Sequence, residues 1–214
     1  LRPQLDWEQW RWCLKFLAQC NDTAFERNVQ QIVALGAYSH AALKDVVRAT
    51  GIQYHRLECG IAHFYSDQKS LDEAGHAVEV MRKFGVQRRL VSRAELLQIE
   101  PAFSAYGERI TGGTYTSTDE SGDARLFTQQ LARRCAERGA QFLYGHDVLR
   151  LNKTGNTIDS VAVSAIQSGA TGQKHSILKG DAIVVACGSY SAPLLRSVGV
   201  DLPIYPGKGY SATF

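Results

Sequence analysis

The amino-acid sequence predicts a mixed α/β fold, and three observations support this prediction. Apolar residues in the first half recur at spacings of three and four, which is the period of an amphipathic helix. Residues 148–165 form two alternating segments around a polar turn at 152–156, as in an antiparallel hairpin. A six-residue apolar run at 182–187 (AIVVAC) ends in a Gly-Ser turn, which is typical of a buried strand in an α/β sheet.

Capping residues define the expected helices. Ser70 and Ser92 each precede a glutamate by three residues, a spacing that forms a capping box. Gly51 and Gly85 follow periodic apolar segments, where glycine commonly ends a helix. Helices are therefore expected at residues 7–17, 29–50, 70–84, 92–100, 123–138 and 192–198, the last two capped by Asp123 and Ser191.

Short β-type segments bounded by turn residues separate these helices. Alternate residues of a strand face one way, so His63 and Tyr65 share a side, where they line a pocket or pack as ordinary sheet residues. Strands are expected at residues 53–58, 61–66, 111–116, 141–144, 148–151, 157–165, 176–178 and 182–187.

Composition excludes several classes of protein. The net charge of +3 is small and the basic residues are dispersed, so we expect no nucleic-acid partner. Five cysteines without a C-x-x-C pair indicate neither a disulfide framework nor a zinc site, and the histidines lack metal-ligand spacing, so no metal site is expected. No segment is long enough to span a bilayer, and the polar, aromatic start does not resemble a signal peptide. A reducing, cytoplasmic location is expected.

Both ends of the chain suggest a piece of a longer protein, because the chain lacks an initiator Met and stops inside an apparent strand at 210–214. Trp7 and Trp10, with Arg11 and Lys15 nearby, favour either an interfacial membrane anchor or, more simply, a helix packed on its own domain.

Two further strings have ordinary interpretations. Residues 207–212 match G-x-G-x-x-A, but prolines precede them and a β-type sequence follows, whereas a dinucleotide loop requires a strand before it and a helix after it. Asp119, Glu120 and Asp123 form an acidic group that is typical of a loop and a helix N-cap.

The turn after the apolar run supports two interpretations. Gly188 has no Cβ, so its backbone can approach a ligand closely, and strand ends in open α/β sheets are where ligands bind. The alternative is a plain strand-to-helix turn.

Three strings resemble the small subunit of D-amino acid dehydrogenases, a family of FAD-dependent amine oxidoreductases related to glycine and sarcosine oxidases. They are residues 112–132, with TSTDESGD and LFT, residues 186–195 (ACGSYSAPLL) and residues 202–211 (LPIYPGKGYS). The resemblance implies a Rossmann-like FAD domain interleaved with a mixed-sheet substrate domain. Residues 1–122 would belong mostly to the substrate domain, residues 123–200 to the returning segment of the FAD domain and residues 201–214 to a second substrate-domain segment.

The resemblance also implies a site. Val148 would meet the adenine of FAD through its backbone, and Ala186, Cys187 and Gly188 would lie against the cofactor. The strand-G-x-G-x-x-G-helix and the C-terminal segment with its carboxylate-binding arginine are absent from the chain. We therefore expect this chain alone to hold FAD poorly and to be inactive.

The implied activity is oxidative deamination of D-amino acids to 2-oxo acids and ammonia, with electrons passing to a quinone-type acceptor of the respiratory chain. Tyr65 and Tyr115 are candidate pocket-lining residues, and no catalytic residue is assigned. Peripheral contact with the inner face of the plasma membrane is a further implication. The alternatives are an oxygen-using oxidase of glycine, sarcosine or another secondary amine, and a non-catalytic module that binds a partner through its tryptophan-bearing face.

Overall fold

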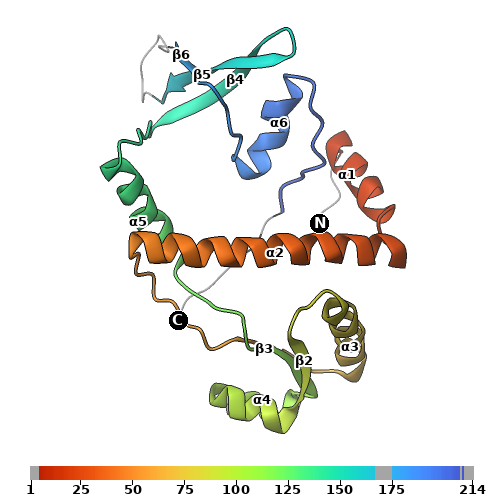
Figure 1. The fold of residues 1–214 in the computed structure, drawn as a ribbon. Helices are drawn as coiled ribbons and strands as arrows, with labels where there is room; N and C mark the ends of the chain where they lie inside the picture. Colours follow the sequence, from red (N-terminus) through yellow and green to blue (C-terminus); the bar gives the residue numbers. More distant parts are fainter. Residues whose placement is uncertain (1–4, 167–174, 208, 210–214) are drawn as a thin grey trace. The chain divides into compact units, whose positions relative to one another are not determined.

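The computed structural model describes residues 5–166, 175–207 and 209. The chain divides into two compact units. Figure 1 labels their helices and strands along the sequence. Unit 1 comprises residues 1–20 and 142–214, and unit 2 comprises residues 21–141. This division differs from the predicted boundaries, because α5 (Ala124–Glu137) belongs to unit 2, where Phe127 packs edge-on against Tyr54. The assignment of segments to a substrate domain and an FAD domain stays a prediction.

Unit 2 is built around a three-stranded antiparallel sheet in the order β1-β3-β2. The strands are β1 (Ile61–Tyr65), β2 (Arg88–Ser92) and β3 (Gly112–Thr116). Gly113 allows the central strand to lie close to its neighbours, since a Cβ there would stand 2.4 Å from the His63 carbonyl oxygen. The expected strands at 61–66 and 111–116 are thereby confirmed.

Helices cover both faces of this sheet. On one face, α4 (Arg93–Ile99) and the 3-10 helix η1 (Pro101–Arg109) enclose the core cluster of Val91, Leu96 and Ile110. On the other face, α3 (Gln68–Lys83) packs against all three strands, with Leu71 over Gly112. This double cover explains why Thr114, in the middle of the central strand, is completely buried.

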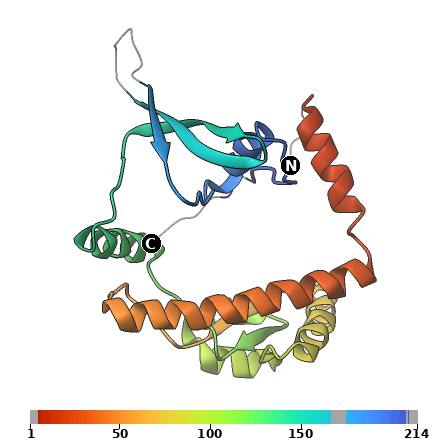
Figure 2. The same cartoon turned by 45° about the horizontal axis from the view of Figure 1, so that its top comes forward.

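Local capping sets the helix ends in unit 2. α2 (Asp22–Thr50) runs as one continuous helix (Figure 2) and ends at Gly51, whose φ of 66° is the left-handed conformation expected there. It begins seven residues before the expected start because Asn21 caps it. The prediction that Ser70 begins α3 was wrong, since Asp67 accepts the hydrogen bond from the Ser70 amide.

Unit 1 contains an antiparallel meander and two helices. The strands β4 (His146–Thr154), β5 (Thr157–Ala165) and β6 (His175–Lys179) pair in the order β4-β5-β6, so the expected hairpin is confirmed. The helices are α1 (Trp7–Leu17), capped by Asp6, and α6 (Ser191–Arg196), which follows the short 3-10 turn η2 (Gly188–Tyr190).

Three expected strands are not formed in the described part of the chain. Residues 182–187 have no regular secondary structure and pair with no described strand, and Val184 is 88% exposed, so the prediction of a buried strand was wrong. A strand requires a neighbour for its backbone hydrogen bonds, and the described residues place none beside this run. Residues 53–58 make only an isolated bridge from Leu57 to Ser121, and residues 141–144 lack strand structure.

Candidate functional site

The turn at Gly188 has the backbone conformation that the ligand interpretation requires. Gly188 has a φ of 56°, which L-residues rarely adopt, and nothing lies within 4 Å of the position that a Cβ would occupy. Ala186 and Cys187 before it are exposed. The backbone of this turn is therefore open to close approach by a ligand.

A hydrogen bond to the side chain of Ser191 stabilises this turn. Its hydroxyl accepts a hydrogen bond from the Cys187 amide at 3.1 Å, and the Tyr190 amide donates to the Cys187 carbonyl, also at 3.1 Å. The expectation that Ser191 caps the following helix was wrong, because Ser191 is itself the first residue of α6. The same contact uses the Cys187 amide, so that amide is not available to a ligand.

Val148 lies on β4, at the outer edge of the described meander. It pairs with Val163, and the ladder is irregular immediately afterwards, between Val148 and Arg150. An edge strand leaves part of its backbone without ladder partners. α6 contacts β4 within unit 1, so the strand of Val148 lies beside the helix that follows the Gly188 turn.

These features fit an adenine dinucleotide in part. An edge strand offers backbone groups to an adenine ring, and an unobstructed glycine turn admits a flat or phosphate-bearing group. All four candidate cofactor residues, Val148, Ala186, Cys187 and Gly188, belong to unit 1.

The candidate tyrosines both lie in unit 2, and the structure does not bring them together. Tyr115 pairs with Ala62, whereas Tyr65 pairs with Gly112, so the two side chains lie on opposite faces of the sheet. The Tyr115 hydroxyl donates to the Cys59 carbonyl at 2.8 Å, and the Arg89 guanidinium stands over its ring. The hydrogen bond fastens Tyr115 to the turn before β1, and the Arg89 contact joins β2 to β3. A role for Tyr65 and Tyr115 in a substrate pocket stays a prediction.

His63 shares the face of Tyr65. Partial burial, and then the nearby Arg88 guanidinium, lower the pKa of His63 below its ordinary value of 6.5. Arg88 itself donates two hydrogen bonds to the Thr114 hydroxyl, at 3.0 and 2.7 Å. Burial and the positive charge of Arg88 therefore both favour the neutral form of the His63 imidazole.

The acidic loop after β3 is structural, as expected. Asp123 caps α5 by accepting from the Leu126 amide, and Glu120 accepts from Arg56 at 2.6 Å. No group of three or more potential metal ligands occurs within the described residues. Most of the G-x-G-x-x-A string at 207–212 lies outside the described residues.

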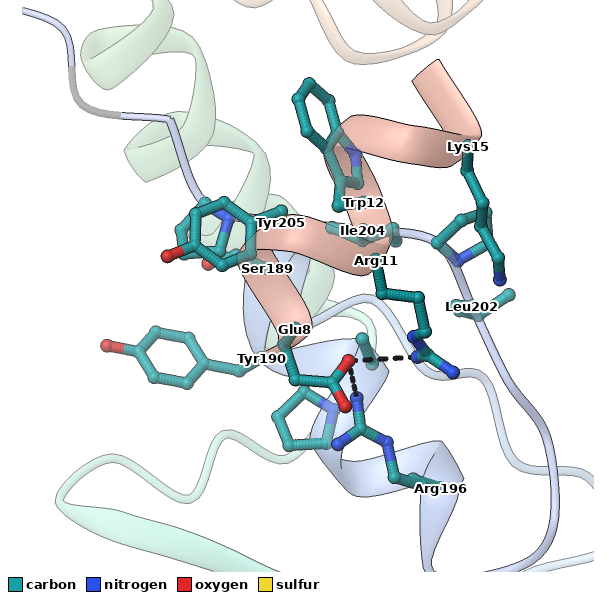
Figure 3. A pocket seen from close by; sticks show the side chains of 14 residues that line it. Glu8, Arg11, Trp12, Lys15, Ser189, Tyr190, Arg196, Leu202, Ile204 and Tyr205 are labelled. Carbon is teal, nitrogen blue, oxygen red and sulfur yellow. Dashed lines mark hydrogen bonds and ion pairs between the residues drawn. The ribbon is translucent and has the colours of Figure 1, made fainter. Parts of the chain in front are cut away.

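The sequence did not predict a groove in unit 1 that borders the Gly188 turn (Figure 3). Its volume is about 340 Å³, and Ser189 and Tyr190 form part of its wall. Trp12 of α1 approaches Tyr205 across the groove, with ring centroids 6.3 Å apart. The remaining lining residues are Glu8, Arg11, Lys15, Ala192, Pro193, Arg196, Leu202, Pro203, Ile204 and Pro206.

An ion-pair network holds α1 to the segment that follows α6. The Glu8 carboxylate lies between the guanidinium groups of Arg11 and Arg196, at 2.9 and 3.1 Å (Figure 3). Asp201 pairs with Arg11 at 2.8 Å and with Lys15 at 3.1 Å. Hydrogen bonds from Lys15 and Arg11 lower the pKa of Asp201 below its ordinary value of 3.8.

Tyr205 is fixed in the groove by Asp6. Its hydroxyl donates to the Asp6 carboxylate at 3.1 Å, and burial together with this bond raises the pKa of the phenol above its ordinary value of 10. The groove joins segments about 190 residues apart, for example Arg11 and Asp201. Neither hydrophobic periodicity nor a sequence motif predicts that these two segments meet. The feature of the sequence that hinted at the contact is that both segments contain aromatic residues.

Comparison with known proteins identifies the family. The sequence profile of the family described as "FAD dependent oxidoreductase" (DAO) matches residues 2–214. The chain belongs to the DAO family. It is 42% identical over 212 residues to a D-amino acid dehydrogenase of Dechloromonas aromatica, a match that covers 99% of this chain and 50% of the relative. A D-amino acid dehydrogenase of Granulibacter bethesdensis is 38% identical over 213 residues, covering 100% of this chain and 49% of the relative.

The chain thus spans about half the length of these DAO-family relatives. L-proline dehydrogenase from P. horikoshii is similar in structure, with a TM-score of 0.59 and 19% identity over 80% of this chain and 41% of that chain. Glycine oxidase from Bacillus cereus gives a TM-score of 0.56 and 22% identity over 80% of this chain and 42% of that chain. At this level of identity the likeness shows the fold, and it confirms the predicted mixed α/β class.

Among the described residues, no helix combines the length and the apolar character needed to cross a membrane.

Proposed function

We propose that the protein containing this chain oxidises D-amino acids to 2-oxo acids and ammonia, using FAD. The observation that supports this most strongly is the 42% identity, over nearly the whole chain, to a protein named D-amino acid dehydrogenase. The match includes the loop after β3, the Gly188 turn and the 202–211 segment, which are the strings that first suggested the resemblance.

Unit 1 would contribute part of the cofactor site. Val148 would present its edge-strand backbone to the adenine, and Ala186, Cys187 and Gly188 would lie along the cofactor, where the left-handed glycine leaves open space. Bound FAD supplies the hydride acceptor, and the protein orients the substrate. Because the chain spans about half of its relatives, we propose that it does not hold FAD firmly by itself.

The substrate α-carbon would lose a hydride and its amine a proton, giving an imine that water converts to the 2-oxo acid and ammonia. No protein base is required if the amine is neutral, so no catalytic residue is proposed. Tyr65 and Tyr115 remain candidates for lining the substrate pocket. A quinone-type molecule would take up the electrons, at the cytoplasmic side of a membrane on which the protein is peripheral.

The test assays the whole protein with D-alanine, D-proline and sarcosine, with a dye acceptor and with oxygen. Dye reduction that depends on a D-amino acid, without peroxide, is the expected result. Peroxide in stoichiometric yield would instead favour an oxidase. Absence of turnover with every amino acid would refute the proposal, and flavin absorbance that copurifies with this chain alone would contradict its weak cofactor binding.

A further inference from the structure

We propose that the groove between α1 and the segment 202–206 binds the head group of an isoprenoid quinone, the electron acceptor of the reaction. This inference rests on the proposed function, because it assumes that electrons leave the enzyme through a quinone-type molecule. Three aromatic side chains line the groove, those of Trp12, Tyr190 and Tyr205. Its apolar wall is formed by Leu202, Pro203 and Ile204.

The walls of the groove suit a flat, uncharged ring. Its volume of about 340 Å³ is at the lower end of the range of about 300–1000 Å³ that is typical of small-molecule sites. Aromatic side chains pack well against planar rings in stacked or edge-on geometries. A ligand in this position would meet the faces or edges of Trp12 and Tyr205.

The rim of the groove supplies hydrogen-bond donors. Within the described residues, Arg11, Lys15 and Arg196 form ion pairs with two carboxylates, those of Glu8 and Asp201. Each Arg carries five N–H donors and Lys carries three, so donors remain after these pairs are made. The complementary ligand is therefore a planar ring with oxygen acceptors at its edge, which describes a quinone.

A second cavity extends the groove along α1. It has a volume of about 430 Å³, shares Trp12, Lys15 and Pro203 with the first cavity, and continues to Phe16. Phe16 stacks on Trp12 with ring centroids 5.3 Å apart. A compact polar-edged head followed by an apolar extension matches a quinone that carries an isoprenoid tail.

Two neighbouring features agree with this ligand. Ser189 and Tyr190, in the wall, directly follow Gly188, the proposed cofactor contact, so the acceptor would bind close to the source of its electrons. On the opposite side of α1, an apolar stripe is exposed, formed by Trp7, Trp10, Leu14 and Leu17. Such a stripe is compatible with a lipid surface that holds long-tailed quinones.

The redox balance is simple. The amino acid loses two electrons and two protons as it becomes the imine, and the quinone gains two electrons and two protons as it becomes the hydroquinone. Hydrolysis of the imine consumes one water and releases ammonia. The groove would therefore accommodate both a ring with two carbonyl oxygens and the same ring with two hydroxyls.

The test uses the FAD-loaded protein that contains this chain, with D-alanine as substrate and three acceptors: phenazine methosulfate, ubiquinone-1 and the tail-less ubiquinone-0. Trp12→Leu should raise the KM for both quinones about tenfold, since a lost aromatic contact costs about 1.4 kcal/mol, and leave dye reduction unchanged. Phe16→Ser should raise the KM several-fold for ubiquinone-1 only. Tyr38→Leu, at an exposed aromatic residue of α2 that lines neither cavity, is the matched control and should change neither KM.

A photoreactive azidoquinone supplies a readout that needs no turnover. It should label residues 8–16 or 189–206, and excess ubiquinone-1 should prevent the labelling. Labelling elsewhere would overturn the inference, as would an unchanged quinone KM in Trp12→Leu or an equal loss of dye reduction in that variant. If the unsubstituted protein reduces no dye with any D-amino acid, the proposed function fails. The labelling experiment would still show whether the groove binds a quinone.

Discussion

In unit 2, helices cover both faces of the β1-β3-β2 sheet, whereas in unit 1 β4 and β6 leave most of their side chains exposed. Leu96 is completely buried in unit 2, whereas Val184 is 88% exposed in unit 1. The helices of unit 2 therefore shield its sheet from solvent on both faces. The described strands of unit 1 lack such a cover, so apolar side chains such as Ile177 and Leu178 of β6 stay exposed.

The largest expected effect tests this contrast in the apolar core. Leu96→Ala should destabilise the chain by about 3 kcal/mol, because it leaves a cavity beneath the sheet. Val184→Ala should change the free energy of unfolding by less than about 0.5 kcal/mol, because Val184 is exposed. Urea denaturation of both variants measures the difference. Equal losses would mean that residues 182–187 are buried after all.

A second pair of substitutions compares two glycines within unit 2. Gly113→Ala should cost about 2 kcal/mol, because the new Cβ would collide with the His63 carbonyl and with Leu96. Gly36→Ala, inside α2 with nothing within 4 Å of its Cβ position, should stabilise the chain by up to about 1 kcal/mol. Thermal unfolding followed by circular dichroism gives both signs. A stabilising Gly113→Ala would disprove the close strand approach.

A substitution in the Gly188 turn of unit 1 should have a smaller effect on the free energy of unfolding. Gly188→Ala should cost about 1 kcal/mol, because the left-handed backbone strains any residue with a Cβ. In the FAD-loaded protein the same change should also raise the dissociation constant for FAD, measured by fluorescence titration. Gly199→Ala, with a φ of 87° and equally open space, is the control for backbone strain alone. Equal FAD affinity in the two variants would remove Gly188 from the cofactor site.

The smallest effect concerns pH and the ion-pair network of unit 1. The pKa of Asp201 is lower in the folded state than its ordinary value of 3.8, so its ionised form stabilises the fold above that pH. This contribution is lost as the pH falls through the lower folded value. Asp201→Asn should therefore reduce the urea midpoint at pH 7 and flatten its decline below pH 4. An unchanged acid profile would show that Lys15 and Arg11 do not bind Asp201 in solution.

Much of the fold was predictable because the relevant interactions are local. Asp123 and Ser92 cap helices as expected, since each cap joins groups three residues apart. The hairpin of β4 and β5 was also expected from its alternating segments, although the predicted turn at 152–156 was too long: pairing continues to Thr154↔Thr157, so the turn is Gly155 and Asn156. The start of α3 was mispredicted because Asp67 and Ser70 are both good caps, and sequence alone does not rank them.

The candidate site was predictable only in part. The Gly188 turn was found because glycine next to an apolar run is a local signal. That Tyr65 and Tyr115 lie on opposite faces follows from the strand register, which the sequence did not supply. The groove was missed because its walls come from both ends of the chain.

The sequence by itself determined the caps of α4 and α5, the hairpin and the family, because these depend on neighbouring residues or on similarity along the whole chain. Only the tertiary structure decided that residues 182–187 pair with no described strand, and that Trp12 meets Tyr205. The physical reason is the separation along the chain of the residues that interact. Capping energies act within one helical turn, whereas strand pairing and groove formation require segments far apart in the chain to meet, and any apolar segment is locally compatible with many partners.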